Sequence, residues 1–157
     1  MATLTVYAKT SDGYIDSYST DYSAARAGTG TLYVDTPGDT LSCGQFLIGD
    51  TYHVYEAFFQ YDTSALPDAS VVFAVKEELY LSLDQSYTDY TEEVRTYDWG
   101  DTLTTDDWVA GANLGNYTLL SSRTVNPSAG YNEFPTSANF IAAISKTGDT
   151  RLFHSSN

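Results

Sequence analysis

The chain has 157 residues, of which 42% are hydrophobic and 18% are charged, a composition that fits one folded domain and excludes a disordered chain. Its 21 acidic and 7 basic residues give a formal net charge of −14, which disfavours binding to nucleic acid and to anionic membrane surfaces. No stretch approaches the roughly 20 apolar residues of a membrane helix, and the N-terminus lacks the basic start and apolar run of a signal peptide. We therefore expect neither nucleic-acid nor membrane partners, and synthesis in a cytoplasm without secretion by a signal.

Short segments that alternate apolar and polar residues, separated by turn residues, predict β-strands along the whole chain. The strongest of them is 52–61, which is rich in aromatic residues and whose run Ala57-Phe58-Phe59 indicates burial on both faces. A bulge is predicted at Lys76-Glu77-Glu78, and a turn at Pro37-Gly38-Asp39. The predicted strands are, in chain order, 3–8, 31–34, 46–48, 52–61, 71–75, 79–83, 91–97, 117–125 and 150–154.

One helix is predicted, from Ser137 to Lys146, because Ser137 can cap it and its apolar residues share one face. A single helical turn is expected at 106–111, capped by Asp106 and ended by Gly111, whereas 16–26 has no clear period. Many short strands with one short helix predict an all-β fold: an antiparallel β-sandwich of jelly-roll type with the helix near the C-terminus. Residues 1–157 are expected to form one such domain.

Catalytic motifs are absent from the sequence, and we expect no enzyme activity and no catalytic residues. His53 alternates with apolar neighbours in a strand, which is typical of a surface or hydrogen-bonded histidine. Glu92 and Glu93 are adjacent on a strand, so their side chains should point to opposite faces rather than share a site. Glu56 and Glu78 are better acid candidates, yet both are expected to be charges at a sheet edge or solvent face.

Neither a metal nor a cofactor is expected. Cys43 is the only cysteine, which excludes an intrachain disulfide and a cysteine-based zinc site, and it is interpreted as a small buried apolar residue. Four aspartates surround Trp99 and could hold calcium, but they lack the spacing and central glycine of an EF-hand loop. The four residues are Asp98, Asp101, Asp106 and Asp107. We interpret them as solvated loop residues and helix caps, which is a simpler explanation than a calcium site.

Two sets of aromatic residues leave an alternative open. Tyr14, Tyr18 and Tyr22 recur at every fourth position in a Ser-rich stretch, which could expose a strip for stacking on sugar rings or supply core packing. A carbohydrate-binding module would need an exposed aromatic platform, for which the candidate residues are Tyr14, Tyr18, Trp99 and Trp108. A structural protein would instead bury both tryptophans.

The segment from Phe59 to Pro67, followed by an apolar strand, resembles the central signature of DNRLRE-type jelly-roll modules. A closer resemblance is to a group of small bacteriophage structural proteins, and it spans nearly the whole chain. The blocks that carry it are Asp12-Gly13-Tyr14-Ile15, Tyr22-Ser23-x-Ala25-Arg26, Arg95-Thr96-Tyr97-Asp98-Trp99-Gly100, Asp107-Trp108-Val109-Ala110-Gly111 and Ser145-Lys146-Thr147-Gly148-x-Thr150-Arg151.

The resemblance implies a virion component without catalytic residues, such as a capsid decoration protein, a head fibre or a tail-associated accessory protein. It implies other virion proteins as partners, a homo-oligomer such as a trimer, and a location in the virion that becomes extracellular after lysis. Such proteins continue into a closing strand where this chain ends at Asn157, so we expect truncation or a strand supplied by a neighbour. The alternative function is a carbohydrate-binding module that attaches to host or extracellular glycans.

Overall fold

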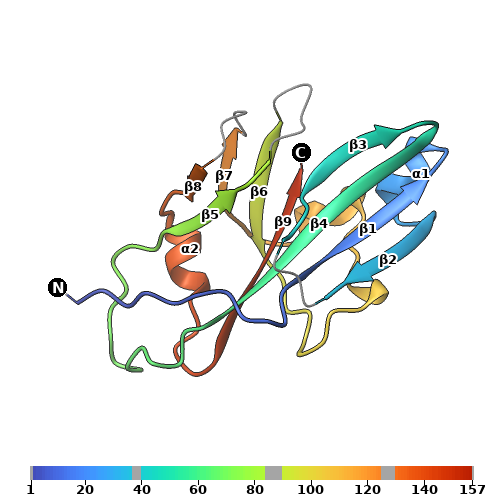
Figure 1. The fold of residues 1–157 in the computed structure, drawn as a ribbon. Coiled ribbons are helices and arrows are strands. Elements are labelled where there is room, and N and C mark those ends of the chain that lie inside the picture. The colour runs from blue at the N-terminus through green and yellow to red at the C-terminus, as the bar shows by residue number, and fades with distance from the viewer. Residues whose placement is uncertain (1, 37–39, 84–89, 125–129, 157) are drawn as a thin grey trace.

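The computed structural model describes residues 2–36, 40–83, 90–124 and 130–156. These residues form nine strands in two antiparallel sheets with a few short helices, which confirms the predicted all-β, sandwich-like fold (Figure 1). Among them, no helix is long and apolar enough to cross a membrane. The predicted turn at 37–39 and the last residue of the predicted strand 117–125 lie outside the described residues.

The large sheet has the strand order β2-β1-β4-β9-β6-β7, and β3 also pairs with β4. Strand β4 is long enough to pair with β3 over its first half and with β9 over its second half. The seven strands are β1 (Gly13–Ser19), β2 (Thr31–Asp35), β3 (Gly44–Ile48), β4 (Thr51–Asp62), β6 (Thr91–Thr96), β7 (Leu119–Thr124) and β9 (Asp149–Ser156). The small sheet consists of β5 (Glu77–Leu81) and β8 (Gly130–Phe134).

One face of the large sheet, here called face A, buries Ile15, Phe58 and Phe153. The segment between β6 and β7 covers it and supplies further apolar residues to the same core, among them Trp99 and Leu114. The helical elements associated with this face are α1 (Tyr22–Ala27) and the short 3-10 helices η1 (Thr105–Asp107) and η2 (Gly111–Asn116).

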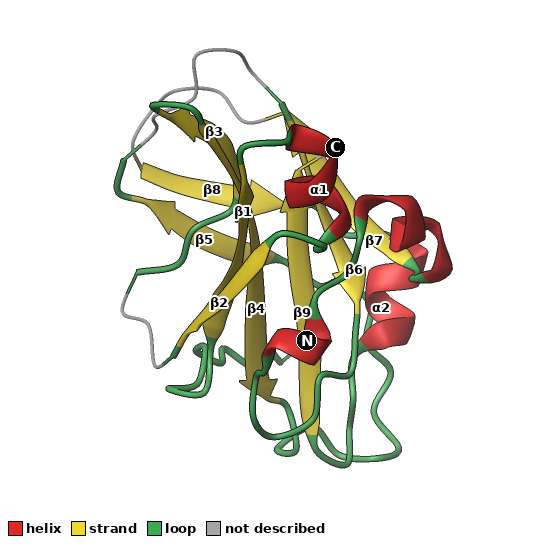
Figure 2. Cartoon of the chain, turned by 90° about the vertical axis from the view of Figure 1, so that its right-hand side faces the viewer, coloured by secondary structure: helices red, strands yellow, loops and turns green. Residues whose placement is uncertain are grey.

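The opposite face, face B, is covered over β9, β6 and β7 by the small sheet and by α2 (Ala138–Ala143). Val94 and Leu152 of the large sheet pack there against Phe134 of β8 and Phe140 of α2. Figure 2 shows β5 and β8 on the side of β1 and β4 opposite to α1. Face B of β1, β3 and the first half of β4 is not part of this core.

Three predicted elements were wrong in detail. Residues 3–8 form no strand, and only Ala8 makes an isolated bridge, to Tyr61. Residues 71–75 are also outside any strand, and β5 starts directly at Glu77 without the predicted bulge. The turn expected at 106–111 is held by Asp107, whose carboxylate accepts from the Thr104 N–H at 2.8 Å, while Gly111 begins η2 instead of ending a helix.

Both α-helices begin at a capping residue, but only one of them was predicted from the sequence. Ser137 caps α2 as predicted, because its Oγ accepts from the Phe140 N–H at 3.0 Å, but the helix ends at Ala143 and not at the predicted Lys146. Helix α1 was not predicted, although Asp21 caps it by accepting from the Ser23 N–H at 2.8 Å and Gly28 ends it with a φ of 70°. The last strand, β9, runs to Ser156 at the centre of the large sheet, further than the predicted 150–154.

Candidate functional surfaces

A row of three aromatic rings crosses face B where three strands lie in register. Tyr18 of β1 lies opposite His53 of β4, which lies opposite Phe46 of β3. The Tyr18 and His53 rings stack with centroids 5.3 Å apart, and the His53 and Phe46 rings stack at the same distance. The rings of this Tyr18–His53–Phe46 row therefore cover one another's faces, which suits packing better than an open sugar platform.

His53 is held in the row by Asp16, whose Oδ2 lies 2.9 Å from His53 Nδ1. Burial raises the pKa of the Asp16 carboxyl, and the contact with His53 opposes that effect. Tyr14 packs its ring edge-on against Tyr55 beside the row, and burial raises the pKa of Tyr14 to about 12. The structure thus makes His53 a hydrogen-bonded strand histidine, as its sequence pattern indicated.

The two tryptophans lie on face A, on the other side of the sheet from Tyr14 and Tyr18. Trp99 is only 3% exposed and packs edge-on against Phe58. Trp108 is half-buried and lies against Gly28, where a Cβ atom would approach its ring to 2.2 Å. The four residues named for the carbohydrate-binding alternative therefore do not meet on one surface.

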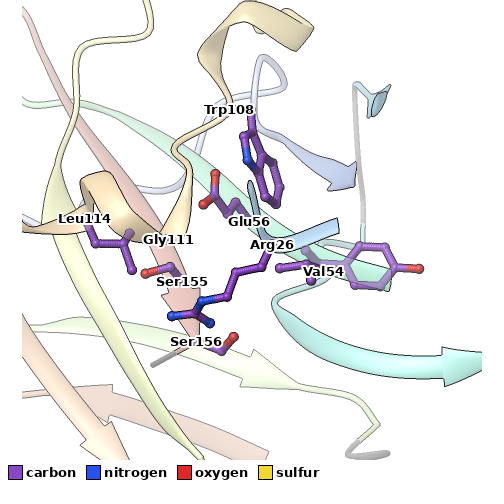
Figure 3. Close-up of a pocket in the computed structure, with 9 residues that line it drawn as sticks. Arg26, Val54, Glu56, Trp108, Gly111, Leu114, Ser155 and Ser156 are labelled. Atoms are coloured by element: carbon purple, nitrogen blue, oxygen red, sulfur yellow. The ribbon is translucent and has the colours of Figure 1, made fainter. Parts of the chain in front are cut away.

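A small pocket lies under Trp108 and is lined by Arg26, Glu56 and Ser155 among others (Figure 3). Glu56 was predicted at a sheet edge or solvent face, but it is buried on the interior strand β4. Its Oε2 accepts from the Val109 N–H at 3.0 Å and so fixes the loop before η2 to β4. Burial raises the pKa of Glu56 well above its usual value. The space in the pocket is about 10 Å³, the size of one water molecule rather than of a substrate.

A second buried group of charges joins the two sheets. His154 of β9 is fully buried, with Nε2 3.1 Å from Oε2 of Glu77 and Nδ1 2.9 Å from Oε1 of Glu92. The Tyr61 hydroxyl donates to Glu77 at 2.6 Å, so strands β4, β5, β6 and β9 all contribute to this His154 cluster. Glu92 faces His154 while the adjacent Glu93 bonds Arg95, which confirms that the two carboxylates point to opposite faces.

Electrostatics in the His154 cluster favour a protonated histidine. Burial by itself lowers the pKa of His154, but Glu77 and Glu92 outweigh burial and raise that pKa to about 10. Both ring nitrogens then donate, one to each carboxylate. Nearby, burial raises the pKa of Asp12 to about 7, and the Glu77 charge adds to the effect. No sequence pattern indicated this cluster, because its members lie far apart along the chain.

The aspartates around Trp99 serve the fold. Asp98 and Asp101 bond the two terminal nitrogens of Arg151, at 2.8 and 2.7 Å. Asp107 closes η1, and no group of metal-ligating side chains is found within the described part of the chain. Glu78, the other acid candidate, is exposed and pairs with Lys76 at 2.9 Å. Cys43 is half-buried with a free thiol whose pKa burial raises.

The small sheet presents exposed apolar side chains on its outer face. Tyr80 of β5 lies directly opposite Tyr131 of β8, and their rings meet edge-on at 5.2 Å. They are 63% and 77% exposed, and Lys76 forms ion pairs with Glu78 and Glu133 on the same strands. We define the β5–β8 surface as this pair together with the exposed residues of the flanking segments: Val71, Phe73, Tyr80, Leu83 and Tyr131.

An open groove of about 450 Å³ runs along the outer edge of β7, between that strand and the start of α2. The backbone of β7 is not free to pair with a further strand there. Asn139 donates to the carbonyl oxygen of Leu119, and Ser137 donates to that of Leu120. The groove is therefore a poor acceptor for a strand from a neighbour.

Comparison of the chain with protein-family models, with curated proteins and with solved structures found no match. The resemblance to DNRLRE-type modules and to bacteriophage structural proteins stays a prediction. What the chain does is therefore inferred from its own residues and surfaces.

Proposed function

We propose that the chain is a non-enzymatic structural component of a bacteriophage particle, a capsid decoration, head-fibre or tail-associated accessory protein that binds other virion proteins. The observation that carries this proposal is the β5–β8 surface. Phe73, Tyr80 and Tyr131 are each more than half exposed, whereas other large apolar residues of the chain are buried in the two cores. Exposed apolar patches of this kind typically mark protein–protein contacts.

The burial of the tryptophans supports the same proposal over the carbohydrate-binding one. Trp99 belongs to the face A core and Trp108 packs against it, as expected of a structural protein. The pocket beside Glu56 has no room for a sugar ring, and Glu56 itself is engaged by a backbone N–H. The carbohydrate-binding alternative keeps one supporting observation, the partial exposure of Tyr14 and Tyr18 on face B.

Co-sedimentation with purified particles of a phage that carries the gene tests the proposal. We expect the purified chain to pellet with particles, and the double variant Tyr80→Ser, Tyr131→Ser to lose at least about 90% of that binding, a tenfold change in affinity or more. Tyr33→Ser is the matched control, because Tyr33 is 53% exposed but lies on β2. A chain that stays in the supernatant, or a control that loses binding equally, would contradict the proposal. Binding to a glycan array that requires Tyr14 and Tyr18 would favour the alternative.

A further inference from the structure

Strand β3 has an outer edge without a partner strand among the described residues. It pairs only with β4, and no other backbone hydrogen bond to Gly44–Ile48 is found within the described ranges. Phe46, Leu47 and Ile48 are 39%, 54% and 55% exposed, so apolar side chains project on both faces of this edge. Proteins usually protect such edges with Lys, Pro or a bulge, and β3 has none of these.

The aromatic row on face B ends at this edge. Its rings follow one another across β1, β4 and β3, each directly opposite the next. Phe46 is the last of them, and its ring is partly exposed beside the edge of β3 that has no partner strand in the described part of the chain. A further strand added to β3 would place its own side chain opposite Phe46, at the spacing that the stacked rings already have.

The charge distribution indicates that the strand added to β3 comes from a second copy of the chain. The chain has a formal charge of −14, so two copies repel one another wherever carboxylates meet. Residues 40–49 contain no charged residue, and β3 lies within that stretch. Two β3 edges can therefore approach without bringing like charges into register. A two-fold axis that passes beside Phe46 makes the two β3 strands antiparallel and keeps the same face of each sheet on the same side. Phe46 then lies opposite Phe46 of the second copy, and Gln45 lies opposite Leu47.

We propose that two copies of the chain pair through the outer edges of β3, antiparallel and with Phe46 opposite Phe46. The large sheets then continue across the two-fold axis, and the two Tyr18–His53–Phe46 rows join into one. This pairing gives a dimer as the unit of assembly, in place of the trimer implied by the resemblance. It does not depend on the β5–β8 surface, because Phe46 lies on β3, whereas Tyr80 and Tyr131 lie on β5 and β8 (Figure 1).

Disulfide trapping tests the register. In a Cys43→Ser background, which removes the only native thiol, Phe46→Cys places two thiols opposite each other across the axis. Directly opposed residues have Cα atoms about 4.5–5.5 Å apart, within the range of a disulfide. We expect a covalent dimer on mild oxidation. Tyr33→Cys in the same background, on the exposed part of β2, should give no covalent dimer under the same conditions.

Sedimentation of the native sequence provides the second measurement. We expect a monomer–dimer equilibrium, and Leu47→Lys should weaken it at least about tenfold by placing charge on both strands of the paired edge. Leu83→Lys adds the same charge on the β5–β8 surface and should leave the dimer intact. A monomer at every concentration, a trimer, or a dimer broken by Leu83→Lys instead of Leu47→Lys would overturn the proposal. None of these outcomes alters the particle-binding test of Tyr80 and Tyr131, so the two proposals fail separately.

Discussion

The Nε2 atom of His154 lies 3.1 Å from Oε2 of Glu77, so a buried ion pair connects the central strand of the large sheet to the small sheet. The imidazole is fully buried between the Phe59 and Phe134 rings, which meet it edge-on at 4.8 and 5.0 Å. A charge in such a position is tolerated because it has two carboxylate partners, and it becomes costly when one of them is removed.

Replacement of Glu77 should weaken the fold strongly. Glu77→Gln keeps the size of the side chain but removes one countercharge of His154 and weakens the acceptor of the Tyr61 hydroxyl. We expect the free energy of unfolding to fall by about 3 kcal/mol, measured by urea denaturation. Glu78→Gln is the control: the neighbouring side chain is exposed and pairs only on the surface, so its loss should cost under about 0.5 kcal/mol.

The His154 cluster also predicts how stability depends on alkaline pH. The folded-state pKa of His154 is about 10, above its ordinary value of 6.5, so its contribution is complete below 6.5 and is lost as the pH rises toward 10. The free energy of unfolding should therefore decrease between about pH 7 and about pH 9.5. Both proteins are compared in a Cys43→Ser background. The variant His154→Gln should be less stable at pH 7, and its free energy of unfolding should decrease less steeply with pH. Equal slopes in the two proteins would contradict the assignment.

The contribution of Asp12 to stability also decreases as the pH rises, but over a lower pH range. Burial raises its pKa from 3.8 to about 7, so its contribution is complete below 3.8 and disappears as the pH rises toward 7. Asp12→Asn retains an oxygen for the Gln60 N–H, which Asp12 accepts at 2.7 Å. Relative to the native sequence, this variant should gain at least about 1 kcal/mol between pH 4 and pH 8. Asp62→Asn should change in the opposite direction, because the pKa of exposed Asp62 is lowered by Ser64.

Gly28 tests the contact with Trp108. Its φ of 70° and the φ of 57° at Gly49 both disfavour a side chain, so alanine at either position should cost about 1 kcal/mol from the backbone. Only at Gly28 would the added Cβ also meet the Trp108 ring, at 2.2 Å. Gly28→Ala should therefore destabilise the protein by about 2 kcal/mol more than Gly49→Ala and shift the tryptophan emission. Equal losses of unfolding free energy in the two variants would show that the Trp108 ring moves aside without cost.

Tryptophan fluorescence separates the two functions directly. Because Trp99 is buried and Trp108 half-buried, acrylamide should quench the native protein much less than the urea-unfolded chain. Addition of oligosaccharides should leave the emission unchanged. A shift in emission on sugar binding that is lost in Trp108→Phe would revive the carbohydrate-binding alternative.

Local patterns predicted most of the strands, missed β1 and β8, and overpredicted strands at 3–8 and 71–75. The aromatic segment 52–61 became β4 because strands lie on both of its sides. Residues 3–8 alternate just as clearly, yet only Ala8 finds a partner, and residues 71–75 are exposed at 71 and 73. Alternation reports a preference for extended backbone, whereas a strand requires a second strand beside it.

The surfaces were less predictable than the fold. Strand β1, which carries both Tyr14 and Tyr18, was not predicted, because residues 16–26 show no clear period. Residue spacing also could not tell that Trp99 and Trp108 would lie on the opposite face of the sheet. The His154 cluster was out of reach because Glu77 and Glu92 arrive from other strands, 77 and 62 residues away in sequence. Helix α1 buries only Ala25 and so lacks an apolar face of large side chains; its available signals were the Asp21 cap and Gly28.

The position of β9 has a consequence for synthesis. In the strand order β2-β1-β4-β9-β6-β7, the strand between the two halves of the large sheet is the last of the nine to leave the ribosome. Until residues 149–156 emerge, β4 and β6 have no hydrogen-bonded connection, so the nascent chain holds two incomplete sheets with open inner edges. Completion of the large sheet therefore waits for β9, and any pause in synthesis before β9 exposes those edges to neighbouring nascent chains.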